Sequence, residues 1–159
     1  MTKVLYTGSF DPITKGHMHL IERASELFDD VVVVVMDNSS KSSMFTQDER
    51  LDLIKGIYKG YTNIRVEKFN GAAVDALDEF HCDAILRGIR NTTDYEYEKT
   101  IARVNEEISN GKAKTICILS KPEYEAFSST VVKEIFSIGK DISNYVDDTV
   151  KLAMIKKRK

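Results

Sequence analysis

The chain has 159 residues, of which 42% are apolar, and this is a usual size for a single domain with one hydrophobic core. Its formal net charge of −2 gives it no general attraction to nucleic acids or to membrane surfaces. No apolar run approaches the roughly 20 residues that cross a bilayer, and no signal peptide precedes the first strand-like run. We therefore expect one domain over residues 1–159, in the cytoplasm, with no nucleic-acid or membrane partner.

Five short, mostly apolar runs predict β-strands. Several are rich in β-branched residues, which suits strands that are covered on both faces. In chain order they are residues 4–6, 31–36, 64–69, 84–86 and 115–119.

Helical patterns fill the gaps between these strands. Apolar residues recur at helical spacing between His17 and Phe28. Thr46 and Glu49 have the spacing of a capping box and predict the start of a second helix. Residues 73–80 suit a short third helix.

A fourth helix is predicted after residue 92. Thr93 and Glu96 have the spacing of another capping box, Gly111 fits a C-terminal stop, and the apolar stripe between them comprises Tyr97, Ile101, Val104 and Ile108. The last forty residues also have helical patterns. The alternation predicts an α/β fold, a doubly wound five-stranded parallel sheet with C-terminal helices.

Polar side chains follow four of the five predicted strands. Parallel sheets bind ligands at the carboxyl ends of their strands, near the point where strand order reverses. The loop after the first strand leads to His17, Lys41 follows the second, Arg87 and Arg90 follow the fourth, and residues 128–130 follow the fifth. Cations, hydroxyl groups and free N–H groups at helix N-termini are what a polyphosphate site needs.

Each of these residues also has a simpler interpretation. His17 either reaches an anion from the first turn of its helix or continues the apolar stripe. Residues 128–130 also suit an N-cap, and Lys41 would be a surface lysine if it did not follow a strand. Two arginines three residues apart after one strand favour a phosphate clamp. The two cysteines suggest neither a zinc site nor a disulfide, and we expect both to be buried.

These segments together resemble a known family. Thr14-Lys15-Gly16-His17 is similar to the T/H-x-G-H motif of the nucleotidylyltransferase superfamily. Residues 44–50, 87–98 and 128–134 follow in the order found in bacterial phosphopantetheine adenylyltransferases, and the resemblance covers nearly the whole chain. The Arg-Thr-x-Gly-Ile-Ser type of segment expected of related cytidylyltransferases is absent.

The resemblance implies a Rossmann-like nucleotidylyltransferase fold, an ATP- and Mg²⁺-dependent reaction and assembly as a hexamer. In that reaction adenylate passes from ATP to 4′-phosphopantetheine, and the products are dephospho-coenzyme A and pyrophosphate. His17, Lys41 and Arg90 would be catalytic, and Ser9, Lys41, Ala73 and Arg87 would bind phosphopantetheine. ATP would contact Ser9, Phe10, His17, Gly88, Ile89, Arg90, Glu98, Tyr124, Glu125, Ala126, Phe127, Ser128, Ser129 and Thr130.

The chain departs from the family pattern at a few positions. Ala72 and Ala73 stand where bulky aliphatic residues are usual, which predicts a roomier pantetheine pocket. Ser9 replaces the common threonine and keeps its hydroxyl group, and Ser137 stands where an arginine is frequent.

The chemistry of the implied reaction limits what the protein must supply. A phosphate monoester with a second pKa of about 6 is already largely dianionic at neutral pH, so no general base is needed. The site must position the reactants and neutralise charge, with Mg²⁺ held by ATP and water rather than by protein ligands.

Two alternative functions stay open at this point. One is a sister transferase acting on nicotinate mononucleotide or a phosphocholine-like acceptor, and the other is a non-catalytic, flavodoxin-like nucleotide-binding module.

Overall fold

The computed structural model describes residues 1–37 and 42–158, and its centre is one five-stranded sheet. Neighbouring strands pair in parallel in the order β3-β2-β1-β4-β5. The strands are β1 (Lys3–Gly8), β2 (Asp30–Met36), β3 (Ile64–Phe69), β4 (Ala84–Ile89) and β5 (Thr115–Leu119). All five predicted strands are present, so the predicted α/β fold with a parallel sheet is confirmed. Strand order reverses between β1 and β4, which become neighbours at the centre.

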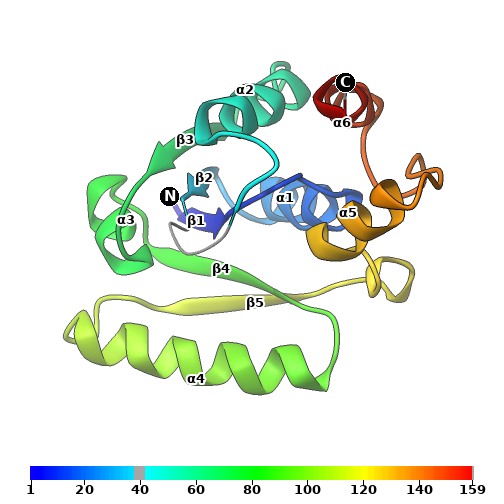
Figure 1. The fold of residues 1–159 in the computed structure, drawn as a ribbon. Helices are drawn as coiled ribbons and strands as arrows, with labels where there is room; N and C mark the ends of the chain where they lie inside the picture. The colour runs from blue at the N-terminus through cyan, green and yellow to red at the C-terminus, as the bar shows by residue number, and fades with distance from the viewer. Residues whose placement is uncertain (38–41, 159) are drawn as a thin grey trace.

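Helices cover both faces of the sheet (Figure 1). They are α1 (Lys15–Leu27), α2 (Gln47–Ile57), α3 (Ala73–Glu79), α4 (Thr92–Ile108), α5 (Ser129–Ser137) and α6 (Asp148–Arg158), with a 3₁₀ turn η1 (Pro122–Tyr124). Among them, α1, α2, α5 and α6 share one hydrophobic core and α3 contributes to another.

The valines of β2 explain why two cores exist. Successive side chains of a strand point to opposite faces of the sheet. Val31, Val33 and Val35 accordingly belong to the core under α1 and α2, whereas Val32 and Val34 belong to the core under α3. An unbroken apolar run is therefore what a strand buried on both faces requires.

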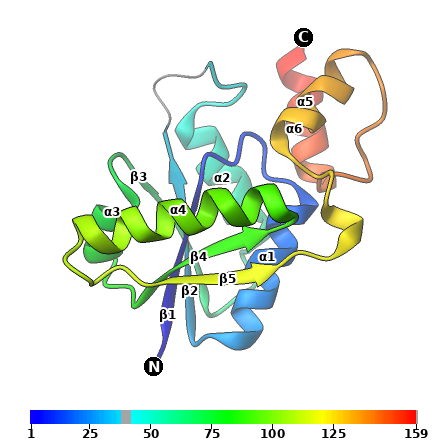
Figure 2. The ribbon, with the colours of Figure 1, turned by 90° about the horizontal axis from the view of Figure 1, so that it is seen from below.

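Helix α4 lies lengthwise over the same face as α3 (Figure 2). Only Glu98 of its 17 residues is buried. The apolar stripe predicted for this helix exists, but it does not pack on the sheet: Tyr97, Val104 and Ile108 are exposed.

The helix starts test the predicted caps. Thr46 Oγ1 accepts from Glu49 N, and Glu49 Oε2 accepts from Thr46 N at 2.8 Å, which confirms the capping box of α2. The predicted cap of α4 is wrong. Asn91, not Thr93, is the N-cap, and its side chain accepts from Asp94 N at 2.9 Å. The helix begins two positions earlier because asparagine is preferred over threonine as an N-cap residue.

The expectation that both cysteines are buried is also wrong. Cys82 is half-buried and Cys117 is exposed. Cys117 lies on β5, an edge strand that has only β4 as a neighbour in the sheet. In the part of the chain that the structure describes, no helix has both the length and the apolar character to cross a membrane.

Candidate active site

A cleft of about 610 Å³ opens where the loops after β1 and β4 meet the N-termini of α1 and α5. It therefore lies at the carboxyl ends of the strands, at the point where strand order reverses, as the rule for parallel sheets predicts. Residues from β1, α1, β4, α4 and the segment before α5 line it.

The loop between β1 and α1 forms one wall of the cleft. Phe10 has a positive φ of 48°, and the Asp11–Pro12 peptide bond is cis. The Phe10 ring is buried and meets the ring of His17 edge-on, with centroids 5.2 Å apart. Thr14 is the N-cap of α1, and its hydroxyl group donates to the carbonyl oxygen of Phe127 at 3.1 Å.

His17 is part of the capping box that starts α1. The backbone N–H of Thr14 donates to Nδ1 of His17 at 3.0 Å. Because a backbone N–H can only donate, Nδ1 carries no proton, and the neutral ring has its proton on Nε2. The helix cap thus fixes the orientation of the ring. Nε2–H takes no part in the cap and can donate a hydrogen bond to a ligand.

The surroundings of His17 keep it neutral. Burial lowers its pKa to about 4, and the nearby charges of Arg90 and Arg87 act in the same direction. At neutral pH the ring is therefore a hydrogen-bond donor without a charge. The apolar stripe of α1 consists of other residues, since the buried side chains of this helix are Leu20, Ile21 and Ala24.

Arg87 and Glu98 form a two-pronged ion pair at the floor of the cleft. Nε of Arg87 donates to Oε2 of Glu98 and Nη2 donates to Oε1, both at 2.8 Å, and Nη1 donates to Thr7 O at 3.3 Å. Glu98 is 7% exposed. The pair occupies the Nε–Nη2 edge of the guanidinium and leaves further N–H groups of Nη1 and Nη2 available.

Arg90 is held by a carboxylate of its own. Its Nε donates to Oδ2 of Asp94 at 2.9 Å, and its backbone N–H donates to the same oxygen at 3.1 Å. Both arginines thus lie in the cleft, each pre-oriented by an acidic residue of α4.

The start of α5 forms the opposite wall. Ser128 Oγ accepts from Val131 N at 3.1 Å, which confirms the predicted cap. Ser129 Oγ donates to Pro12 O at 2.7 Å and so ties this helix to the loop after β1. A helix N-terminus at the rim offers N–H groups and positive potential to an anion.

Most of the predicted site residues meet in this cleft. Its walls include Ser9, Phe10, His17, Arg87, Gly88, Arg90, Glu98, Tyr124, Phe127, Ser128 and Ser129. The residues that line it do not include Ala73, Ile89, Glu125, Ala126 or Thr130. Ala73 packs against the core under α3, and Gly71 lines the cleft instead. Lys41 lies outside the described residues.

Gly88 belongs to the site for a packing reason as well. A Cβ at this position would lie 2.2 Å from Cδ1 of Leu20. The glycine therefore permits α1 to approach β4, and this approach sets the distance between His17 and the two arginines.

Several residues of the site were not found from the sequence. Thr7, Asp37, Asp94 and Ser120 line the cleft, and the buried Asp11 and Arg50 lie behind it. Asp94 and Arg50 belong to the segments that carry the family resemblance, but short-range spacing gives no sign of what they contact.

The acidic residues of the cleft do not form a metal site by themselves. Over residues 1–37 and 42–158, no group of three or more His, Cys, Asp or Glu is arranged to hold a metal ion. Glu98 and Asp94 are paired with Arg87 and Arg90.

Comparison with known proteins gives consistent matches over most of the chain. The cytidylyltransferase-like family model matches residues 5–135. A phosphopantetheine adenylyltransferase of Limosilactobacillus reuteri is 41% identical over 157 residues, covering 99% of this chain and 90% of the relative. The enzyme of that name from Clostridium perfringens is 42% identical over 142 residues, covering 89% of this chain and 86% of the relative.

Solved structures agree on the fold. A protein from Vibrio parahaemolyticus described as a nicotinate-nucleotide adenylyltransferase has a TM-score of 0.67 at 21% identity, covering 98% of this chain and 99% of its own. A lipopolysaccharide core biosynthesis protein from Thermoplasma volcanium has a TM-score of 0.57 at 24% identity, covering 76% of this chain and 98% of its own. At these identities the similarity concerns the fold alone.

Proposed function

The chain belongs to the phosphopantetheine adenylyltransferases of the cytidylyltransferase-like family, and from this membership we propose that it transfers adenylate from ATP to 4′-phosphopantetheine. The products are dephospho-coenzyme A and pyrophosphate, so the enzyme acts in coenzyme A biosynthesis. The observation that carries the proposal is the meeting of His17, Arg87, Arg90 and the N-terminus of α5 in one cleft.

The reaction requires one anion to attack another. An oxygen of the acceptor phosphate forms a bond to the α-phosphorus of ATP as the bond from that phosphorus to the bridging oxygen of pyrophosphate breaks. Because the acceptor is already largely dianionic, no proton has to be removed. Catalysis then consists of bringing the two phosphates together and stabilising the charge that builds up between them.

The cleft supplies groups for each part of that task. Nε2–H of His17 is the donor for an α-phosphate oxygen in the transition state, and its fixed tautomer means that no reorganisation is needed. Arg87, together with Ser9 and Lys41, receives the acceptor phosphate. Arg90 and the N-terminus of α5 take up the charge that develops on pyrophosphate.

The ion pair with Arg87 indicates a role for Glu98 other than the ATP contact that the resemblance implies. Its carboxylate is bound to Arg87 at both oxygens, so we assign it to orienting Arg87 rather than to contacting ATP. The acceptor phosphate then uses the N–H groups of Arg87 that Glu98 leaves available.

Mg²⁺ belongs to the proposal as a companion of ATP. The arginine-paired carboxylates fit a site where the triphosphate and water supply most of the ligands of the ion. The ion would supply further charge neutralisation on the phosphates. A cytoplasmic location, and one catalytic domain over residues 1–159, belong to the same proposal.

Assembly as a hexamer is the last part of the proposal. The stripe of Tyr97, Val104 and Ile108 leaves apolar side chains of α4 exposed, and Leu119 of the edge strand β5 is 75% exposed. Burying such surfaces between copies would remove apolar area from water.

One experiment tests the activity directly. The protein is mixed with ATP, Mg²⁺ and 4′-phosphopantetheine, and we expect dephospho-coenzyme A by mass spectrometry and an equal amount of pyrophosphate. Parallel reactions contain nicotinate mononucleotide as acceptor or CTP as donor. Faster pyrophosphate release in either of them would overturn the assignment of the substrates, and no release in any would indicate a non-catalytic nucleotide-binding module.

A further inference from the structure

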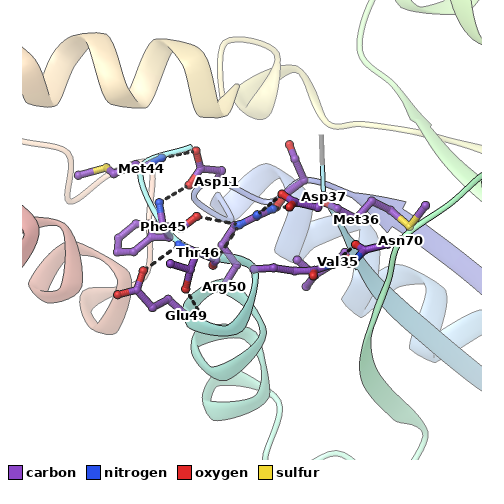
Figure 3. A network of polar contacts seen from close by, with 12 residues as sticks. Asp11, Val35, Met36, Asp37, Met44, Phe45, Thr46, Glu49, Arg50 and Asn70 are labelled. Atoms are coloured by element: carbon purple, nitrogen blue, oxygen red, sulfur yellow. Dashed lines mark hydrogen bonds and ion pairs between the residues drawn. The ribbon is translucent and has the colours of Figure 1, made fainter. Parts of the chain in front are cut away.

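Arg50 is the most deeply buried cation among the described residues, and the proposed reaction makes no use of it. Its exposure is 1%, and it lies on the first turns of α2 with no contact to the cleft itself. A buried arginine is retained only where its N–H groups are satisfied, and here they are satisfied by the backbone that surrounds the cleft (Figure 3).

The guanidinium group binds the ends of two strands. Nη1 donates to Ser9 O at 2.7 Å and to Met36 O at 3.1 Å, and Nη2 donates to Oδ1 of Asp37 at 2.9 Å. Ser9 follows β1 and Met36 ends β2, and both line the cleft. Arg50 therefore fixes the spacing between the loop after β1 and the end of β2 on this side of the site.

Further contacts of Arg50 link these segments to the residues just before α2. Nε of Arg50 donates to Phe45 O at 3.2 Å and to Thr46 O at 3.3 Å. The N–H groups of the same segment are held by Asp11, whose carboxylate accepts from Met44 N at 2.8 Å and from Phe45 N at 2.9 Å. The segment is thus clamped on both sides of its backbone.

The contact with Ser9 has a direct consequence for the site. Phe10, the next residue, has a φ of 48°, a left-handed conformation that is unfavourable for a non-glycine residue. Arg50 holds the carbonyl of the peptide that joins these two residues. It thereby sets both where the Ser9 hydroxyl points and where the Phe10 ring meets His17.

These contacts all lie on one side of the cleft. The groups assigned to the pyrophosphate end of ATP, namely Arg90 and the start of α5, are held by Asp94, Ser128 and Ser129 and, among the described residues, have no contact with Arg50. We propose that Arg50 is a positioning residue for the acceptor half of the site: it sets the loop that carries Ser9 and the end of β2, and it acts on acceptor binding much more than on ATP binding. This inference takes the identity of the acceptor, and nothing else, from the proposed function.

The test compares Arg50→Gln and Arg50→Lys with the control Arg23→Gln, which removes an exposed arginine of α1 that pairs with Glu26. For each variant we measure KM for phosphopantetheine, the affinity for ATP by calorimetry, kcat and the melting temperature. We expect the acceptor KM to rise by about 10-fold or more in both Arg50 variants, with ATP affinity within about 3-fold of wild type. Lysine cannot reproduce the planar fork, so it restores part of the melting temperature without restoring the acceptor KM.

A second variant covers the case in which the Arg50 variants do not fold. Asp37→Ala removes one partner of Arg50 at an exposed position and leaves its four backbone carbonyl acceptors in place, so the fold should survive. If Asp37 acted only by its charge in the cleft, its removal would favour a phosphate acceptor and lower KM. If it supports Arg50, KM rises while ATP affinity holds.

Hydrogen exchange by NMR gives a readout that does not depend on the substrate. We expect the amides of residues 8–13 to exchange faster in Arg50→Gln and to be unchanged in Arg23→Gln. Equal loss of affinity for both substrates, or a folded Arg50 variant with normal acceptor KM and normal exchange, would overturn the inference. Failure of the wild-type enzyme to use phosphopantetheine would instead overturn the proposed function, and the exchange result would still decide the role of Arg50.

Discussion

His17 has two physical roles in one ring. Nδ1 completes the helix cap by accepting a hydrogen bond from Thr14 N, and Nε2 carries the N–H that can donate a hydrogen bond to a phosphate oxygen. An alanine at this position would remove both roles, and a loss of activity would then be hard to assign. Glutamine keeps the first role, because a glutamine at N3 of a capping box can still accept from the N-cap backbone, and it removes the imidazole N–H from the position that the ring gives it.

We expect His17→Gln to lower kcat by about 10²–10³-fold, the usual effect of removing one transition-state donor. ATP affinity should change far less, since Arg90 and the start of α5 still bind the phosphates. The melting temperature should stay close to wild type because the cap is retained. The check is kcat, ATP affinity and melting temperature on one sample. Near-normal turnover in a folded variant would remove His17 from the mechanism.

The lowered pKa of His17 also predicts how stability depends on pH. In the folded chain this pKa is about 4, and its ordinary value is 6.5. Between these values the unfolded chain binds more protons, so the free energy of unfolding falls as the pH is lowered from 6.5 to 4 and is insensitive to this group above pH 7.

His17→Gln removes this titration. At about 1.4 kcal/mol per pKa unit, wild type should lose on the order of 3 kcal/mol more than the variant across that window. Urea unfolding of both proteins at pH 4.5 and pH 7.5 measures the difference. Parallel pH profiles for the two proteins would show that the ring titrates normally.

The two arginines should divide the substrates between them. Because Glu98 is nearly buried, removing Arg87 alone would leave an unpaired carboxylate and destabilise the fold. The comparison is therefore Arg87→Ala with Glu98→Gln against Glu98→Gln alone, beside Arg90→Ala against wild type. We expect the first to weaken phosphopantetheine binding and the second to weaken ATP binding, each by about 10- to 150-fold. Calorimetric titrations in which either change weakens both substrates equally would contradict this division.

At the scale of elements, the site depends on how closely α1 lies on β4. The contact is made at Gly88, where an added Cβ would overlap Leu20. The same contact places the first turn of α1, with His17, beside Arg87 and Arg90. Arg87 lies within β4, which is longer than the sequence predicted, and only Arg90 follows it.

Gly88→Ala should therefore destabilise the protein by about 1–3 kcal/mol, the usual effect of overpacking a core. Because the colliding atom is the end of a leucine side chain, Leu20→Val in the same chain should recover part of the loss. Chemical denaturation of both variants measures the effect. The matched control is Gly56→Ala, because a Cβ at Gly56 of α2 meets no atom within 4 Å, and we expect this change to be neutral or stabilising. Equal stabilities of Gly88→Ala and wild type would show that α1 can shift freely.

At the scale of the whole molecule, α4 turns its apolar stripe away from the sheet. If the proposed hexamer forms through this surface, Ile108→Glu should reduce the oligomer to smaller species at equal protein concentration. Light scattering after size exclusion measures the mass, which for wild type should be six times that of one chain. Lys112→Glu, which changes charge at an exposed position near the end of α4, is the control. A wild-type monomer at micromolar concentration would end the hexamer proposal.

The elements of the fold and most of the candidate site could be predicted from the amino-acid sequence. Mostly apolar runs located the strands. A strand covered on both faces has few polar positions, as the valines of β2 illustrate, and the edge strand β3 still has its buried Ile64 and Val66. Parallel strands then brought His17, Arg87 and Ser128 to one edge of the sheet, since the carboxyl ends of the strands must share it. These inferences need only local periodicity and one topological rule.

The tertiary structure decided what each residue contacts. Periodicity found the apolar stripe of α4 but not the direction in which it faces, because that depends on which other surface covers the sheet. The pairing of Arg87 with Glu98 joins β4 to α4, and the contacts of Arg50 join residues up to 41 positions apart. Side chains separated in this way have no fixed spacing in the sequence, so only packing could show which carboxylate orients which arginine.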